Sequence, residues 1–329
     1  MGASGQPLLD VSHLSTSFFT DKGEIRAVQD VSLAIHHGQT LALVGESGCG
    51  KSVTALSIMR LVDPPGRIVN GQISFKGQDL LGLSEKALRD IRGKAIGMVF
   101  QEPMTSLNPV FTIGKQIGEV LQIHTTLSAQ EIRQEVLHIL EKVRIPSPEQ
   151  RIDQYPHELS GGMKQRVMIA MALVCQPDLL IADEPTTALD VTIQAQILEL
   201  LKDLQAEMGL AILLITHNLG VVAQFAQEVI VMYASQIAER AGVEQLFKNP
   251  AHPYTRALLM SLPHPGGRGK MLASIPGTVP SPLYYPHGCH FSTRCQEVLD
   301  FCSEKEPPLI QITEEHEAAC WLHAPNPRI

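Results

Sequence analysis

The stretch GESGCGKS, residues 45–52, constrains the fold of this chain more than any other feature. The apolar run LALVG leads into it, and the helix-compatible run SVTALSIMRL leaves it. Glycines in such a loop let backbone N–H groups turn toward an anion at the start of a helix. The pattern therefore predicts a strand–loop–helix unit that binds phosphate groups. The residues expected at the phosphates are Gly45, Ser47, Gly48, Cys49, Gly50, Lys51, Ser52 and Val53.

A second short stretch, LLIADEP at residues 179–185, places two carboxylates at the end of an apolar run. Such a run is typical of a buried parallel strand, at whose end Asp183 can help to hold a metal ion. Glu184 follows directly, where it can polarise an attacking water. Lys51 provides a cation for the β- and γ-phosphate oxygens, and Ser52 provides a hydroxyl for Mg²⁺. Together these residues predict a site that binds and hydrolyses ATP with Mg²⁺.

Short apolar runs alternate with helical patterns along much of the chain, which predicts a layered α/β fold. The stretch from about 102 to 174 is mainly helical and separates two strand-rich blocks, which indicates an inserted helical subdomain. Residues 249–286 are rich in proline, so we place a boundary at about residue 248. We expect the remainder to be a small appended unit that does not continue the sheet. Strands are expected within residues 8–44, 96–100, 179–183 and 211–216, and amphipathic helices at 131–143 and 192–209.

The composition argues against several classes of protein. The chain has 329 residues, of which 44% are hydrophobic and 18% charged, as in soluble globular proteins. Its net charge of −8 argues against a nucleic-acid partner, which a basic surface would favour. No apolar run reaches the roughly 18 to 20 residues that cross a bilayer, and the N-terminus lacks the pattern of a signal peptide. These features predict a cytosolic protein that binds no nucleic acid.

The most diagnostic stretch is ELSGGMKQR at residues 158–166. Ser160, Gly161 and Gly162 open a second helix whose N-terminus can bind an anion. With the two stretches above, it makes the chain resemble the ABC ATPases, the nucleotide-binding subunits of ABC transporters. In that family LSGG is the signature, and it contacts the γ-phosphate of ATP held by the phosphate loop of a partner subunit.

Further motifs of the family occur in the same order as in its members. Gln101 in VFQEP fits the Q-loop, which in that family contributes to catalysis and, with Ser52 and Asp183, holds Mg²⁺. The sequence ALD fits the D-loop through Asp190, which is also a residue type that caps helices. His217 follows the run AILLIT and fits the switch histidine that contacts the γ-phosphate.

The resemblance also implies a fold and a place for adenine. Phe18 stands where the family has an aromatic ring that stacks on adenine, although the neighbouring Phe19 competes for this role. The implied fold is a P-loop NTPase, RecA-like ABC ATPase core with an antiparallel β subdomain, an inserted helical subdomain and a small C-terminal extension. The core is expected at residues 1–248, with the helical subdomain at about 102–174, and the extension at 249–329. The implied catalytic residues are Glu184, His217 and Gln101.

Finer sequence features narrow the kind of ABC ATPase. The runs SVTALSIMRL, FQEPMTSLNPV and NPAHPYTRALLMSLP resemble the dipeptide/oligopeptide importers, and within them the D-type subunit. This implies an ATPase that powers peptide import as a heterodimer with a paralogous F-type ATPase. The other implied partners are two transmembrane permease subunits and, indirectly, a periplasmic or extracellular peptide-binding protein. The implied location is peripheral, at the cytoplasmic face of the bacterial inner membrane.

Some alternatives remain open at this point. An ABC ATPase of a nickel or other small-solute importer shares much of the core, and soluble ABC ATPases of DNA repair or translation are more distant. Met104, Leu107 and Pro109 lie where the family receives coupling helices of the permeases, but such residues also occur in ordinary cores.

Four cysteines fall in the last part of the chain, with the spacing C-x5-C-x6-C-x17-C. Thiolates in such a set can hold zinc or an iron–sulfur cluster, or the cysteines can be reduced structural residues. The tail resembles that of the peptide-importer ATPases, which implies a 4Fe–4S cluster. His316 and His323 are further candidate ligands. The expected cluster ligands are Cys289, Cys295, Cys302 and Cys320.

Overall fold

The computed structural model describes residues 5–101, 106–187, 189–262 and 275–324. The chain forms two compact units, each built from segments that are distant in the sequence. The first unit comprises Met1–Leu8, Ile35–Thr40 and Lys76–Ile215. The second unit comprises Leu9–Ala34, Leu41–Phe75 and Thr216–Ile329.

The first unit contains three parallel strands in the order β6-β7-β8. Their bounds are β6 (Ile96–Val99), β7 (Leu179–Asp183) and β8 (Ala211–Thr216), of which the last residue belongs to the second unit. Every residue of β7 and β8 is buried, which is why both strands read as continuous apolar runs. The strands predicted at these positions are confirmed.

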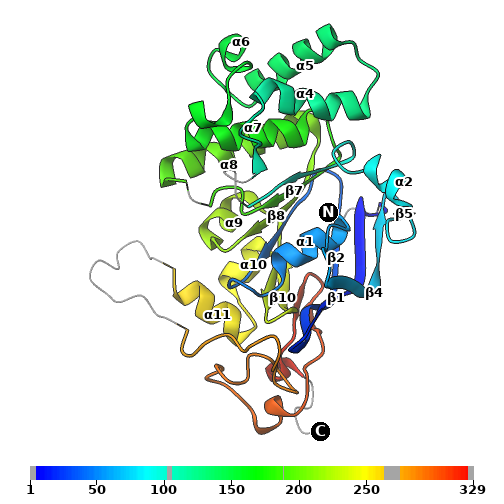
Figure 1. Cartoon of the computed structure of the whole chain (residues 1–329). Helices are drawn as coiled ribbons and strands as arrows, with labels where there is room; N and C mark the ends of the chain where they lie inside the picture. The colour runs from blue at the N-terminus through cyan, green and yellow to red at the C-terminus, as the bar shows by residue number, and fades with distance from the viewer. Residues whose placement is uncertain (1–4, 102–105, 188, 263–274, 325–329) are drawn as a thin grey trace. The chain divides into compact units, whose positions relative to one another are not determined.

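Helices α4, α5 and α7 of the first unit contact one another, and α8 contacts α7 (Figure 1). Helix α5 begins with a capping box, in which Ser128 and Glu131 satisfy each other's backbone N–H groups. The predicted face of this helix, with Val136 and Leu140, is buried. The helices are α2 (Glu85–Arg89), α4 (Ile113–His124), α5 (Ala129–Lys142), α6 (Pro148–Arg151), η1 (Pro156–Glu158), α7 (Gly161–Leu173) and α8 (Val191–Met208), and the short strand β5 is Gln78–Asp79.

The second unit contains an antiparallel arrangement of β2 (Gly23–Ile35), β1 (Leu9–Thr20) and β4 (Gly66–Phe75) in that order. It also contains a sheet in the order β3-β9-β10-β12-β11, in which β3 and β9 are parallel. These strands are β3 (Thr40–Val44), β9 (Glu228–Tyr233), β10 (Gln236–Gly242), β12 (His316–Ala318) and β11 (Ile310–Thr313). The helices are α1 (Lys51–Ile58), α9 (Leu219–Phe225), α10 (Val243–Lys248), α11 (Pro253–Met260), η2 (Asp300–Ser303) and η3 (Trp321–His323).

The C-terminal extension, residues 249–329, is built into the second unit. Its strand β12 pairs with β10, so that Ala318 lies opposite Glu239. The prediction that this segment does not continue the sheet is therefore wrong. Strand β12 has three residues, which are too few to show a periodic pattern. A buried polar contact holds it beside β10 instead. The carboxylate of Glu239 lies 2.7 Å from Nε2 of His316 and also accepts the N–H groups of Ala251 and His252 at 2.7 and 2.8 Å.

The extension also shares the apolar core of the second unit. The ring of Phe291 is 3% exposed and lies 5.1 Å from the ring centre of Tyr233 and 5.4 Å from that of Tyr254. Figure 1 shows α10 and α11 beside β10, and both helices contact that strand. Because the extension and the strands bury one another, the extension is an integral part of this unit. The domain boundary at residue 248 stays a prediction.

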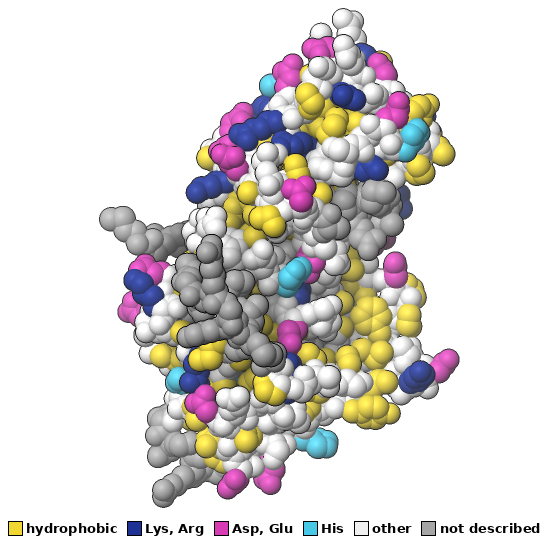
Figure 2. Space-filling model, turned by 90° about the vertical axis from the view of Figure 1, so that its left-hand side faces the viewer, with side chains coloured by type: hydrophobic (Ala, Val, Ile, Leu, Met, Phe, Trp, Pro, Cys, Tyr) yellow, Lys and Arg dark blue, Asp and Glu magenta, His cyan; other side chains and the backbone are white. Residues whose placement is uncertain are grey.

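The face of the molecule drawn in Figure 2 is of mixed charge. On the face drawn in Figure 2, basic and acidic side chains are interspersed among apolar ones. None of the helices in the described ranges combines the length and the apolar character that a membrane crossing requires.

Candidate functional site

The phosphate loop, Gly45–Ser52, joins β3 to α1 in a shape that requires glycine at two positions. Gly45 has a φ of 153° and Gly50 a φ of 105°, both in the region that favours glycine. A Cβ atom at Gly45 would lie 2.2 Å from the carbonyl oxygen of Met232 in β9. A Cβ atom at Gly50 would lie 2.3 Å from the carbonyl oxygen of Ala27 in β2. The backbone of the loop is therefore packed directly against two strands of the same unit.

Lys51 is the first residue of α1 and is 5% exposed. Its Nζ donates to the carbonyl oxygens of Gly45 at 2.8 Å and Glu46 at 3.0 Å. The first N–H groups of a helix have no acceptor within the helix, and they carry the positive end of its dipole. A phosphate group that enters the loop therefore meets the Lys51 ammonium group and the positive end of the helix dipole.

Two side chains from far along the sequence hold Glu46 within the phosphate loop. Its N–H donates to Oη of Tyr254 at 3.0 Å. Its carboxylate accepts from Nη1 of Arg294 at 2.7 Å and from Nη2 at 3.2 Å. Burial lowers the pKa of Arg294, but hydrogen bonds to Glu46 and Tyr233 raise the pKa more, so the guanidinium is charged. No sequence motif links Glu46 to Arg294, since the two residues lie 248 positions apart.

The two aromatic residues proposed for adenine have different surroundings in the second unit. Phe18 is half-buried, and a Cβ atom at Gly66 would lie 2.5 Å from its ring. Phe19 is 40% exposed, and the guanidinium carbon of Arg67 lies 4.3 Å from its ring centre. Arg67 therefore already provides a cation–π partner for Phe19. Stacking of Phe18 on adenine stays a prediction.

In the first unit, the structure brings Glu184 and Gln101 together. Asp183 is the last residue of β7, and Glu184 follows with a φ of 46° and donates its N–H to the carbonyl oxygen of Ile215 at 2.9 Å. Oε2 of Glu184 accepts from Nε2 of Gln101 at 3.1 Å and from Oγ1 of Thr187 at 2.7 Å. The carboxylate is thus held by two neutral donors. Its catalytic role, and Mg²⁺ binding by Asp183 and Gln101 with Ser52, stay predictions.

The signature opens α7, and the D-loop residue Asp190 opens α8. Oγ of Ser160 accepts from the N–H of Met163 at 3.4 Å, and a carboxylate oxygen of Asp190 accepts from the N–H of Ile193 at 2.9 Å. A Cβ atom at Gly162 would lie 2.9 Å from Cγ2 of Ile193. The small signature residues therefore allow the starts of the two helices to pack closely. Contact of the signature with a partner's ATP stays a prediction.

The predicted site residues fall into two sets. The phosphate loop, Phe18 and His217 belong to the second unit, and His217 is exposed directly after β8. Gln101, Asp183 and Glu184 belong to the first unit, as do the signature and Asp190.

Part of the predicted permease-docking segment lies outside the described residues. Met104 is not described, and neither is Ala188 of the D-loop sequence. Leu107 is 3% exposed and belongs to the core, whereas Pro109 is exposed. Of the three proposed docking residues, Leu107 is therefore the one that fits the alternative of an ordinary core residue.

The four cysteines of the extension line one cavity of about 20 Å³. This volume suits about one water molecule, and a 4Fe–4S cluster is several times larger. Burial raises the pKa of the Cys289 thiol to about 12 and that of Cys320 to about 11, whereas metal ligation requires thiolates. Among the residues that the structure describes, no group of three or more His, Cys, Asp or Glu side chains is arranged to hold a metal ion. The predicted cluster, with ligands Cys289, Cys295, Cys302 and Cys320, and the predicted metal-binding role of these cysteines are therefore wrong.

The two histidines considered as further ligands have structural partners. Nε2 of His316 lies 2.7 Å from Oε1 of Glu239, and both side chains are at most 1% exposed. Nε2 of His323 lies 3.1 Å from the carbonyl oxygen of Ala251. Both contacts tie the end of the extension to β10 and to the start of α11.

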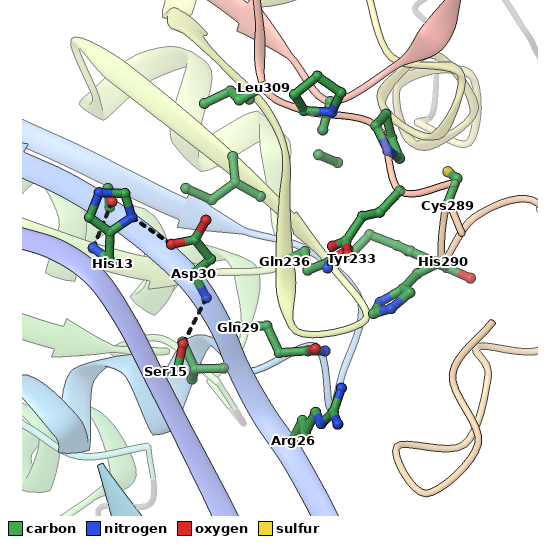
Figure 3. Close-up of a pocket in the computed structure, with 18 of the residues that line it drawn as sticks. His13, Ser15, Arg26, Gln29, Asp30, Tyr233, Gln236, Cys289, His290 and Leu309 are labelled. Carbon is green, nitrogen blue, oxygen red and sulfur yellow. Dashed lines mark hydrogen bonds and ion pairs between the residues drawn. The ribbon is translucent and has the colours of Figure 1, made fainter. Parts of the chain in front are cut away.

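A larger cavity of about 820 Å³ lies within the second unit, between β1, β2, β10 and the extension (Figure 3). His13 and Asp30 lie on one side of it in this view, and Cys289 and His290 lie on the other. Nδ1 of His13 is 2.7 Å from the carboxylate of Asp30, whose N–H donates to Oγ of Ser15 at 3.1 Å. The phosphate loop does not line this cavity. No sequence pattern predicts this cavity, because its walls come from segments that are distant in the sequence and meet only in the folded chain.

Two families match separate parts of the chain. Residues 28–187 match the family described as "ABC transporter", a range that includes the phosphate loop, the signature and Glu184. Residues 238–302 match the family described as "Oligopeptide/dipeptide transporter, C-terminal region". The resemblance drawn from the motifs is therefore confirmed.

Similar proteins and structures agree with this result. The chain is 54% identical to the probable peptide ABC transporter ATP-binding protein y4tR of Sinorhizobium fredii, over 95% of this chain and 94% of that protein. It is 51% identical to the oligopeptide transport ATP-binding protein OppD of Bacillus subtilis, over 97% of this chain and 90% of that protein. A solved dimeric structure of the ATP-binding cassette MJ0796 in a post-hydrolysis state, bound to ADP and phosphate, matches with a TM-score of 0.65 and 27% identity, over 71% of this chain and 98% of that chain. The chain therefore belongs to the ATP-binding proteins of peptide ABC transporters and has the ABC ATPase fold and activity.

Proposed function

We propose that this chain hydrolyses ATP to power the import of dipeptides or oligopeptides through a membrane transporter. The observation that carries the proposal is the extension, which matches the C-terminal region of oligopeptide/dipeptide transporters. In the structure this extension is joined to the phosphate loop through Arg294 and Glu46. The names of the similar proteins, which refer to peptide and oligopeptide transport, support the same substrate class.

The proposed mechanism assigns separate tasks to the two sets of site residues. Lys51 and the N–H groups at the start of α1 compensate the charge that develops on the phosphates. Glu184 orients or activates the attacking water, and its carboxylate is already oriented by Gln101 and Thr187. His217 contacts the γ-phosphate. The signature of a second subunit completes each ATP site, so that ATP closes the dimer and hydrolysis reopens it.

The proposed assembly is the one that the resemblance to peptide importers implies. The chain pairs with a paralogous F-type ATPase, and the pair acts on two permease subunits at the cytoplasmic face of the membrane. A separate peptide-binding protein delivers the peptide outside. The mixed surface charge gives no reason to add a nucleic-acid partner.

Glu184→Gln tests the catalytic assignment. We expect ATP to bind with unchanged affinity and kcat to fall by about 100-fold or more, because an amide cannot accept a proton from water. Turnover of ATP and the Kd for ATP are measured on the purified transporter. Glu199→Gln, on the exposed face of α8, is the matched control and should behave as the unmodified chain. Equal turnover in Glu184→Gln and the control would contradict the assignment.

An uptake assay tests the substrate class. Vesicles that contain the complete transporter and its binding protein are supplied with ATP on the side of this subunit. We expect accumulation of labelled trialanine that Glu184→Gln abolishes. Accumulation of labelled Ni²⁺ in place of the peptide would favour the metal-ion importer instead.

A further inference from the structure

The guanidinium of Arg294 connects the extension to the phosphate loop with every donor group in use. Nη1 and Nη2 hold Glu46, and Nη1 also lies 3.3 Å from Oη of Tyr233. Nε donates to the carbonyl oxygen of Pro276 at 2.9 Å, and Nη2 lies 3.4 Å from that of Ile275. Because backbone groups of the extension fix the guanidinium plane, the two-pronged contact fixes the direction of the Glu46 carboxylate.

This ion pair also decides the charge of the loop. The side chain of Arg294 is 3% exposed and that of Glu46 is 29% exposed, so solvent screens the pair weakly. A carboxylate without a counter-charge would repel a triphosphate that enters the same loop. Arg294 therefore removes an electrostatic obstacle to ATP that the loop would otherwise carry.

The contact between Arg294 and Glu46 also affects Lys51, the residue expected to bind the phosphates. The carbonyl oxygens of Gly45 and Glu46 accept from Nζ of Lys51. The N–H of Glu46 is held by Tyr254 of α11, and its side chain by Arg294. A movement of Glu46 would thus shift both carbonyl groups that position the ammonium of Lys51.

We propose that Arg294 is a positioning residue for ATP binding. It neutralises Glu46 and holds the phosphate loop in the form that accepts ATP, so that the extension sets the ATP affinity of this subunit. The proposal rests on the phosphate loop being the ATP site. It assigns the extension a role in the ATPase cycle beyond marking the transporter class.

Arg294→Gln is the central variant, and its readouts are the Kd for ATP and the separate values of KM and kcat. We expect the Kd and KM to rise by about 10-fold, because the variant leaves Glu46 without its counter-charge. At saturating ATP we expect kcat to stay within about 2-fold, since Arg294 touches no reacting atom. Arg294→Lys keeps the positive charge but loses the planar guanidinium. Its Kd for ATP should lie between those of the unmodified chain and Arg294→Gln.

The double variant Arg294→Gln, Glu46→Gln separates charge neutralisation from a general packing effect. Removing the unpaired carboxylate should restore the Kd to within about 3-fold of the unmodified chain. A double variant that binds ATP as weakly as Arg294→Gln would overturn the proposal. Should Arg294→Gln not fold, the comparison of Arg294→Lys with the double variant answers the same question.

Arg256→Gln is the matched control, because Arg256 forms an ion pair with Glu297 at 2.9 Å in the same unit without touching the loop. We expect its Kd for ATP to equal that of the unmodified chain. Equal weakening of ATP binding in Arg256→Gln and Arg294→Gln would show a loss of fold and overturn the proposal. Unchanged ATP affinity in Arg294→Gln, alongside a loss in Lys51→Met, would overturn the proposal and leave the ATP site intact. Unchanged affinity in Lys51→Met would instead contradict the ATP site itself.

Discussion

The two sets of site residues are supported in opposite ways. Glu184 is held by Thr187, three positions away, and by Gln101, and both partners are neutral. Glu46 of the phosphate loop is held by Tyr254 and Arg294, which are 208 and 248 positions away. The catalytic set therefore depends on the motifs themselves, whereas the phosphate-binding set depends on the extension.

The chemistry of the partners differs as well. Gln101 and Thr187 are neutral donors that orient the Glu184 carboxylate through hydrogen bonds. Glu46, in contrast, is paired with the positive charge of Arg294. Without that charge, its carboxylate would repel the phosphates of ATP. One carboxylate thus accepts hydrogen bonds from neutral donors, and the other is paired with a positive charge.

Lys51→Met should cause the largest loss. Its ammonium is the cation at the start of α1, so we expect the Kd for ATP to rise on the order of 100-fold. The measurement is titration calorimetry with ATP on the purified chain. Lys202→Met, on the exposed face of α8, serves as the control. A variant of Lys51 that binds ATP normally would break the assignment of ATP binding to the second unit.

Thr187→Val removes one of the two donors to Glu184 without changing the shape of the side chain much. We expect kcat to fall by about 10-fold, because the carboxylate loses part of its orientation. The Kd for ATP should not change, and steady-state kinetics together with calorimetry separate the two values. Thr192→Val, at the exposed start of α8, is the control. Weaker ATP binding with unchanged kcat would show that the division between the two sets is wrong.

His252→Asn tests how the extension is attached, because His252 caps α11, the helix that carries Tyr254. Burial, followed by the charges of Arg256 and His323, lowers the pKa of His252 from 6.5 to about 3. The folded state therefore keeps this ring neutral, and stability is lost as the pH falls below 6.5, where the unfolded chain takes up the proton.

Asparagine keeps the cap but does not titrate. We expect the unmodified chain to lose about 2 kcal/mol more unfolding free energy than the variant between pH 7 and pH 5. Urea unfolding at both pH values provides the measurement, and the difference between the chains removes the contribution of other groups. Equal losses of unfolding free energy in the two chains would show that the titration of His252 does not affect how firmly the extension is attached.

Local patterns sufficed for the elements with strong periodicity. The strand before Asp183 and the face of α5 were predicted from apolar spacing, because a buried strand or an amphipathic helix needs only its own residues to show its pattern. Strand β12 was missed, because three residues carry no period and the strand exists through the pairing of His316 with Glu239. The iron–sulfur prediction failed because cysteine spacing does not reveal the size of the cavity that the thiols line.

The order of residues along the chain is sufficient to indicate the family, the ATP chemistry and the local conformation of each motif. The positive φ angles of the phosphate-loop glycines and the caps at Ser160 and Asp190 involve only a few neighbouring residues, so the sequence pattern reveals them. The pairing of the extension with the sheet and the ion pair between Arg294 and Glu46 are visible only in the folded chain. The reason is that the energy of a buried ion pair depends on distance and solvent exposure, which residues 248 positions apart acquire only when the chain is folded.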